Sequence, residues 1–112
     1  MKTEIFQHKM VEYTIYIGQN KQDNFDIIDA ASSSDVWFHV SDFPSCHVIL
    51  KTDEKISSIP HQVIKRCAYL CKINSKAKTQ SKCYISYTTI DNIKKTEIVG
   101  QVQVKNYKTV SV

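Results

Sequence analysis

Hydrophobic and polar side chains alternate through residues 35–50, which is the period of a β-strand. In the first part Trp37 and His39 share one face, and the apolar residues between and beside them share the other. Phe43-Pro44-Ser45 then interrupts the pattern, because proline cannot donate to a strand ladder and favours a turn. Alternation resumes at His47. We therefore expect two strands that pair as a hairpin and gather Trp37, His39 and His47 on one face.

This face has two interpretations. An aromatic ring beside two histidines is a candidate functional surface. A sheet covered on both sides would instead bury Trp37 against a helix, and histidines are also found satisfied in cores or at sheet edges. The pattern alone leaves both interpretations open.

The flanking sequence predicts further strands and two helices. Strands are expected at residues 5–6, 13–17, 82–89, 100–104 and 109–112. A polar turn leads to a short helix that ends near Ala31, with Asp23 or Asn24 as its N-cap. A longer helix is predicted from about Ile59 to Asn74, because apolar residues recur there at helical spacing.

Another face of the longer helix is basic and carries an aromatic ring. Lys65, Tyr69, Lys72 and Lys76 recur along it at intervals of three and four residues. Residues 76–81 are predicted to be a loop, and residues 91–96 a turn that carries Lys94 and Lys95. A basic face of this kind is typical of nucleic-acid binding and equally of a solvated helix surface.

These elements predict one domain over residues 1–112. Strands, a short helix, a hairpin, a long helix and more strands follow one another in the chain. This order favours an α+β fold, with a mostly antiparallel sheet of about five to six strands and two packed helices.

Charge is unevenly distributed along the chain. Residues 1–56 hold five lysines against nine acidic residues, whereas residues 57–112 hold ten basic residues against two acidic ones. The net charges are therefore −4 and +8. Such asymmetry indicates a polyanionic partner, although a lysine-rich solvated surface would also produce it.

The sequence offers little evidence for catalysis or metal binding. It has no glycine-rich phosphate loop, no nucleophile elbow and no H-E-x-x-H motif. Cys46 and His47 are poorly placed as nucleophile and base, because adjacent strand residues point to opposite faces. The four cysteines lack a paired C-x-x-C and are expected to be reduced, small apolar residues rather than zinc ligands. We expect no enzyme activity, cofactor or metal.

The cellular location is predicted from the absence of a signal-peptide pattern and of a membrane-spanning run. Met1 to His8 do not form the apolar core of a signal peptide, and no apolar run is long enough to span a membrane. We therefore expect a cytosolic protein without a membrane partner.

The central segment also resembles a known family. It reads D-V-W-F-H-V at residues 35–40 and P-S-C-H-V-I-L at residues 44–50. This resembles the D-x-W-hydrophobic-H and S-x-H-V motifs of the NFACT-R domain, the RNA-binding domain of ribosome quality-control factors and their bacterial relatives. Other matching segments follow in the family's order: Gly18-x-Asn20-x-x-x-Asn24, residues 68–76, Asn92-Ile93-Lys94-Lys95, Gly100-x-Val102 and Lys108-Thr109.

The resemblance has limits. The standalone domain and its motifs are most similar to small eukaryotic members of the family. Those members also carry a coiled coil, which residues 1–112 do not contain. Residues 1–112 also do not contain the N-terminal domain of longer members. Their tailing and ubiquitin-ligase-recruiting roles are therefore not transferred. Cys46 replaces a residue that is frequently small in the family.

The resemblance implies an RNA-binding module whose partner is transfer RNA or ribosomal RNA, on the ribosome. Lysines would contact phosphates, with loose sequence specificity, while aromatic and histidine side chains would contact bases. The predicted contact residues are Trp37, His39, His47, Lys65, Lys72, Lys76, Tyr87, Lys94 and Lys95. Two alternatives remain: a protein partner on the face with Trp37, His39 and His47, or DNA on the same basic surface.

Overall fold

The computed structural model describes residues 1–42 and 44–112. The part of the predicted strand break that falls on Phe43 lies outside the described residues. The strands are β1 (Lys2–His8), β2 (Val11–Ile17), β3 (Val36–Val40), β4 (Val48–Lys51), β5 (Tyr84–Thr89), β6 (Ile93–Lys95), β7 (Val102–Val104) and β8 (Lys108–Ser111). The helices are α1 (Lys21–Asp29) and α2 (His61–Ile73), with 3-10 turns at Ile56–Ser58, Lys76–Thr79 and Ile90–Asn92.

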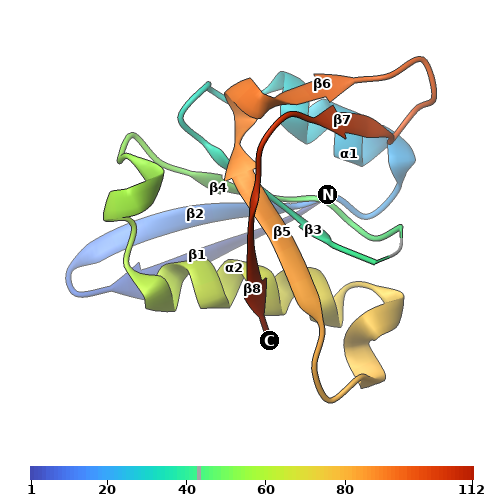
Figure 1. Cartoon of the computed structure of the whole chain (residues 1–112). Coiled ribbons are helices and arrows are strands. Elements are labelled where there is room, and N and C mark those ends of the chain that lie inside the picture. Colours follow the sequence, from blue (N-terminus) through green and yellow to red (C-terminus); the bar gives the residue numbers. More distant parts are fainter. Residues whose placement is uncertain (43) are drawn as a thin grey trace.

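Six strands form the main sheet, in the order β1-β2-β4-β3-β5-β8 with every pair antiparallel. Strands β6 and β7 pair separately and form a two-stranded extension that we call the arm. Figure 1 shows α2 on one side of the main sheet, and α1 with the arm on the other. The predicted α+β architecture, with a six-stranded antiparallel sheet and two helices, is confirmed.

The predicted hairpin occupies the centre of the sheet. Strands β3 and β4 pair with each other, with Trp37 opposite Ile49 and Phe38 opposite Val48. Strand β2 pairs with β4, and β5 pairs with β3. Both hairpin strands therefore have neighbours on either side, and their side chains can be covered on both faces.

The two faces of the sheet bury different cores. The face under α2 buries a large apolar cluster that includes Ile15, Val36, Phe38, Val40, Val48, Leu50, Val63, Cys67, Cys71 and Ile85. The face under α1 buries a smaller cluster made of Ile27, Ile28, Trp37 and Ile49, with Val102 and Val104 of the arm packed against it. The second interpretation of the hairpin is therefore the correct one for Trp37, because that ring is buried beneath a helix.

Several local predictions need correction. The N-cap of α1 is Asn20, whose Oδ1 accepts from the backbone N–H of Asp23 at 2.8 Å, because the helix begins before the predicted cap residues. Residues 76–79 form a 3-10 turn within the predicted loop. Residues 93–95 are a strand rather than part of a turn. The strand predicted over residues 100–104 pairs with them, so it belongs to the arm and not to the main sheet.

Candidate functional site

Trp37, His39 and His47 form a compact ring cluster on the α1 face of the sheet. Trp37 and His39 stack with centroids 5.5 Å apart and planes 7° from parallel. His47 meets Trp37 edge-on at 5.5 Å and His39 at 5.1 Å. The predicted grouping is therefore confirmed. Only His39 is half-exposed, since Trp37 and His47 are 3% and 2% exposed.

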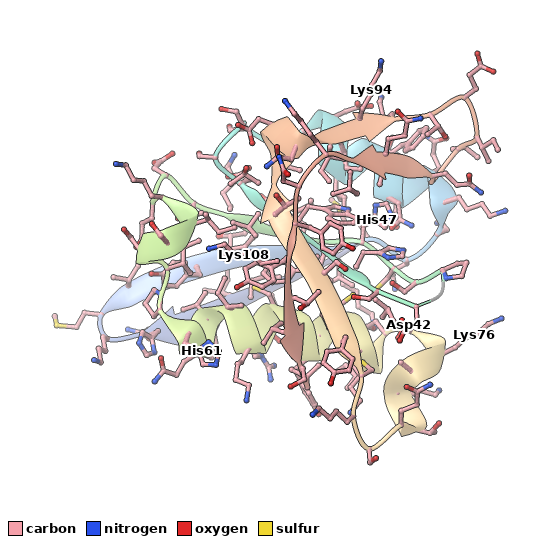
Figure 2. All side chains as sticks on the ribbon, viewed as in Figure 1. Asp42, His47, His61, Lys76, Lys94 and Lys108 are labelled. Atoms are coloured by element: carbon pink, nitrogen blue, oxygen red, sulfur yellow. The ribbon has the colours of Figure 1, made fainter. Side chains whose placement is uncertain are left out.

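The ring cluster lines an open pocket of about 590 Å³, which we call the ring pocket. Its walls come from the start of α1, the β3–β4 connection and the arm. Figure 2 shows His47 in the space between the arm and the central strands. The lining residues are Lys21, Asn24, Trp37, His39, Pro44, Ser45, His47, Ile98, Val99, Gly100, Gln101, Val102 and Val104. Segments far apart in the sequence thus meet at one site.

Buried hydrogen bonds fix the position of His47. Its backbone N–H donates to Asn24 Oδ1 at 3.0 Å, and its carbonyl accepts from the N–H of Gly18 at 2.9 Å. A Cβ atom on Gly18 would lie 2.1 Å from Asn24 Oδ1, so any other residue there would displace the Asn24 side chain from this hydrogen bond. Sequence reasoning treated Asn24 as a helix cap and missed this role; its spacing from Gly18 was the available signal.

The histidines of the ring pocket are uncharged at neutral pH. Burial, together with the neighbouring His39, lowers the pKa of His47 from 6.5 to about 3. Burial also lowers the pKa of His39. The Nε2 atom of His39 accepts from the backbone N–H of Ser45 at 3.4 Å, as a neutral ring allows. The deep part of the pocket therefore carries polar groups without charge.

Asp35, the first residue of the D-x-W motif, has a structural role. Its side chain is 1% exposed and accepts from the backbone N–H groups of Ser32 at 2.9 Å and Thr52 at 3.0 Å. Lys51 Nζ lies 3.4 Å from the same carboxylate. Asp35 therefore joins the segment before β3 to the segment after β4 and holds the hairpin in place.

The sheet separates several predicted contact residues from the ring cluster. Tyr87 stacks on Phe38 at 5.5 Å on the α2 face, and burial raises its pKa. Lys72 is only 9% exposed, and its Nζ donates to the carbonyl of Val112 at 3.3 Å. Lys65 is exposed on the outer side of α2. These three residues therefore cannot join Trp37, His39 and His47 in one contact surface.

The two adjacent lysines of β6 have different surroundings. Lys94 is exposed, and Figure 2 shows its side chain pointing away from the ribbon. Lys95 forms an ion pair with Asp29 and lies over the ring of Phe25, 5.1 Å from its centroid. Alternation along a strand explains the difference, since Lys95 faces α1 whereas Lys94 faces solvent. Lys95 therefore fastens the arm to α1.

Two basic and aromatic segments remain exposed on the surface. The arm patch consists of Lys94 and Lys105, both exposed, which line a shallow depression of about 300 Å³. Tyr107 and Lys108, also exposed, follow Lys105 in the chain towards β8. The segment that follows α2 exposes Lys76, Lys78, Lys82 and Tyr84, and Lys82 Nζ lies 5.4 Å from the Tyr84 ring centroid. The residues predicted from the sequence did not include Tyr107 or Tyr84, although Tyr107 precedes Lys108 in the chain and Tyr84 lies two residues after Lys82.

Other kinds of site find no support in residues 1–42 and 44–112. Within these ranges no group of three His, Cys, Asp or Glu side chains is placed to hold a metal ion. The four cysteines are free thiols, three of them buried. Neither described helix is long and apolar enough to cross a membrane.

The fold and these surfaces define a small α+β module with exposed basic and aromatic patches and one partly enclosed ring pocket. A model of the NFACT protein RNA binding domain matches residues 2–106. The chain therefore belongs to this family, as the motifs around Trp37 suggested.

Individual relatives agree with this assignment. The chain is 39% identical over 105 residues to coiled-coil domain-containing protein 25 of Mus musculus, covering 89% of this chain and 50% of that protein. It is 32% identical over 83 residues to the Rqc2 homolog RqcH of Bacillus subtilis, covering 73% of this chain and 14% of that protein. The chain thus spans about half the length of the small relatives and a much smaller part of the bacterial one.

The fold is shared with a solved bacterial structure. The C-terminal region of the fibronectin/fibrinogen-binding protein from Streptococcus suis superposes with a TM-score of 0.85 at 24% identity, over 100% of this chain and 45% of that chain. At this identity the likeness establishes the fold alone.

Proposed function

We propose that this chain is an RNA-binding module of ribosome-associated quality control, with transfer RNA or ribosomal RNA as its ligand. The observation that carries the proposal is the family match over residues 2–106, which covers nearly the whole described domain. The similarity to RqcH, an Rqc2 homolog, supports the ribosomal context. The excess of eight positive charges in residues 57–112 supports a polyanionic ligand.

The arm patch is the surface that supports phosphate contact best. Lys94, Lys105 and Lys108 are exposed and have no carboxylate within ion-pair distance among the residues that the structure describes. Tyr107, between Lys105 and Lys108 in the chain, is 59% exposed and offers a ring on which a base can stack. Lysines at such a surface give affinity that depends on salt and little on sequence.

Two alternative ligands were predicted from the sequence, a protein partner and DNA. On the face where a protein partner was predicted to bind, Trp37 and His47 are buried and His39 is half-exposed. DNA would bind through the same lysines and by the same charge attraction, so it requires no separate surface. Duplex DNA is therefore included as one ligand in the test.

The test is fluorescence anisotropy with labelled transfer RNA, a ribosomal RNA hairpin and duplex DNA across a salt series. The variant is Lys94→Glu with Lys105→Glu. We expect RNA affinity to fall at least about tenfold, and the slope of log affinity against log salt to fall by about two, because two phosphate contacts are lost.

A matched control separates the patch from net charge. Lys9→Glu with Lys55→Glu makes the same change in net charge at exposed positions in the acidic half of the chain. We expect it to weaken binding far less. Equal losses in the two variants would mean that only total charge matters, and no RNA binding at low salt would overturn the proposed function.

A further inference from the structure

The ring pocket contains two buried polar atoms that have no hydrogen-bond partner within the described residues. They are Nε1 of Trp37 and Nδ1 of His47. Both residues are more than nine-tenths buried, and both line the same pocket. Buried donors and acceptors are almost always paired in folded proteins, because an unpaired one retains the cost of losing water. A ligand group that reached these two atoms, each of which exposes less than 1 Å², would supply the missing partners.

The shape and lining of the pocket fit a small flat molecule. Its volume of about 590 Å³ lies within the range of about 300–1,000 Å³ typical of small-molecule sites. Ile98 and Val99 on the turn of the arm are 58% and 40% exposed, so they present apolar surface at its rim. The half-buried ring of His39 continues the stack begun by Trp37.

The polar groups of the pocket favour an uncharged ligand group with a phosphate beside it. The indole N–H of Trp37 can only donate, and the uncharged His47 ring can donate or accept. Neither carries the charge that a buried phosphate would require. Lys21 is the one charged residue among the lining residues. It lies against Gly100, where a Cβ would be 3.0 Å from Lys21 Cβ and where φ is +84°.

We propose that the ring pocket binds one unpaired nucleobase of RNA. Trp37 Nε1–H donates to an acceptor on the base edge, His47 Nδ1 bonds the neighbouring polar group, and Lys21 meets the adjoining phosphate. Unpaired bases are recognised in this way, by stacking on aromatic rings and by hydrogen bonds to their edges. This inference rests on the proposed function and adds to it, because the arm patch alone would not distinguish single-stranded from paired RNA.

Trp37 is the only tryptophan of the chain, so it reports on the pocket directly. The whole ¹⁵N-labelled chain is titrated with AMP, CMP, GMP and UMP, and with ribose 5-phosphate as the base-free control. The indole Nε1–H resonance and the tryptophan emission are followed. We expect at least one nucleotide to shift the resonance and change the emission saturably, whereas ribose 5-phosphate changes neither.

The matched variants are His47→Phe and His61→Phe. His47→Phe keeps a ring and removes Nδ1, whereas His61 is exposed at the start of α2, far from His47 in Figure 2. We expect nucleotide affinity to fall about threefold to tenfold in the first, as for one lost hydrogen bond, and to stay unchanged in the second. The titration of the unaltered chain decides the matter if His47→Phe does not fold.

The RNA anisotropy assay is run beside the titration so that the two proposals fail separately. RNA binding without any response at Trp37, from nucleotides or from the RNA, would overturn the base pocket and leave the RNA-binding function standing. A nucleotide response without RNA binding would show that the ring pocket binds free nucleotides, and it would overturn both RNA as the ligand of the pocket and the RNA-binding function.

Discussion

The two faces of the main sheet carry different kinds of interior. Beneath α2 the side chains form one large apolar cluster, and seven residues of that helix are buried. Beneath α1 and the arm the apolar cluster is small, and it adjoins a pocket with two histidines and unpaired polar atoms. One hairpin supplies both interiors, because Phe38 and Trp37 are neighbours on β3 that point to opposite faces.

The difference indicates a division of work between the faces. Complete apolar burial maximises stability and leaves no group for a ligand. The face under α1 contributes less to stability, because it carries neutral polar atoms, an open pocket and exposed apolar residues at the rim of that pocket. The aromatic and histidine motif of Trp37, His39 and His47 lies on this second face, so we expect ligand recognition there.

The largest effect is expected from Phe38→Ala, on the α2 face. Phe38 is fully buried, and truncation of such a side chain lowers the free energy of unfolding by about 3–5 kcal/mol. Urea unfolding followed by Trp37 emission measures the loss. A loss below about 1 kcal/mol would contradict the view that this face supplies most of the stability.

An intermediate effect is expected from pH, on the pocket face. His47 stays unprotonated in the folded chain down to a pKa of about 3, whereas the unfolded chain takes up this proton below about pH 6.5. Stability is therefore fully present above pH 6.5 and falls as pH decreases towards 3, by up to about 1.4 kcal/mol per pH unit from this residue. Urea unfolding between pH 7 and pH 4.5, followed by circular dichroism, tests the slope.

The same two histidine variants isolate this contribution. His47→Phe should flatten the dependence on pH, whereas His61→Phe should keep it, because His61 is exposed. Identical slopes in the two variants would show that the carboxylates, and not the ring pocket, set the acid sensitivity.

The smallest effect on stability is expected at the rim of the pocket. Ile98→Ser should leave the free energy of unfolding within about 0.5 kcal/mol, because the side chain is 58% exposed. The same change should weaken the nucleotide response at Trp37 if this residue covers a bound base. Calorimetry and the indole titration together test whether apolar residues on this face serve binding rather than folding.

Much of the fold was predictable because its signals are local. Alternation around Pro44 located β3 and β4, and the 3.6-residue spacing behind Pro60 located α2. The grouping of Trp37, His39 and His47 followed from the same alternation once a hairpin was assumed. Local patterns of this kind specify an element and the direction of its side chains.

The rest depended on contacts between distant parts of the chain. Lys95 pairs with Asp29, and Lys72 reaches the carbonyl of Val112, so neither lysine could be recognised as engaged from its own neighbours in sequence. The arm was predicted as a turn and a separate short strand, because nothing local shows that residues 93–104 fold over Trp37. Which lysines contact RNA stays a prediction.

The arm also makes the ring pocket a late product of folding. The pocket is lined by residues from Lys21 to Val104, and its last wall is contributed by β7. Contacts across so many residues form slowly, after the local hairpin of β3 and β4. At a synthesis rate of about 5–20 residues per second, the end of the arm leaves the ribosome roughly 3–11 s after His47 does. A newly made chain therefore has its β3–β4 hairpin before it has its pocket.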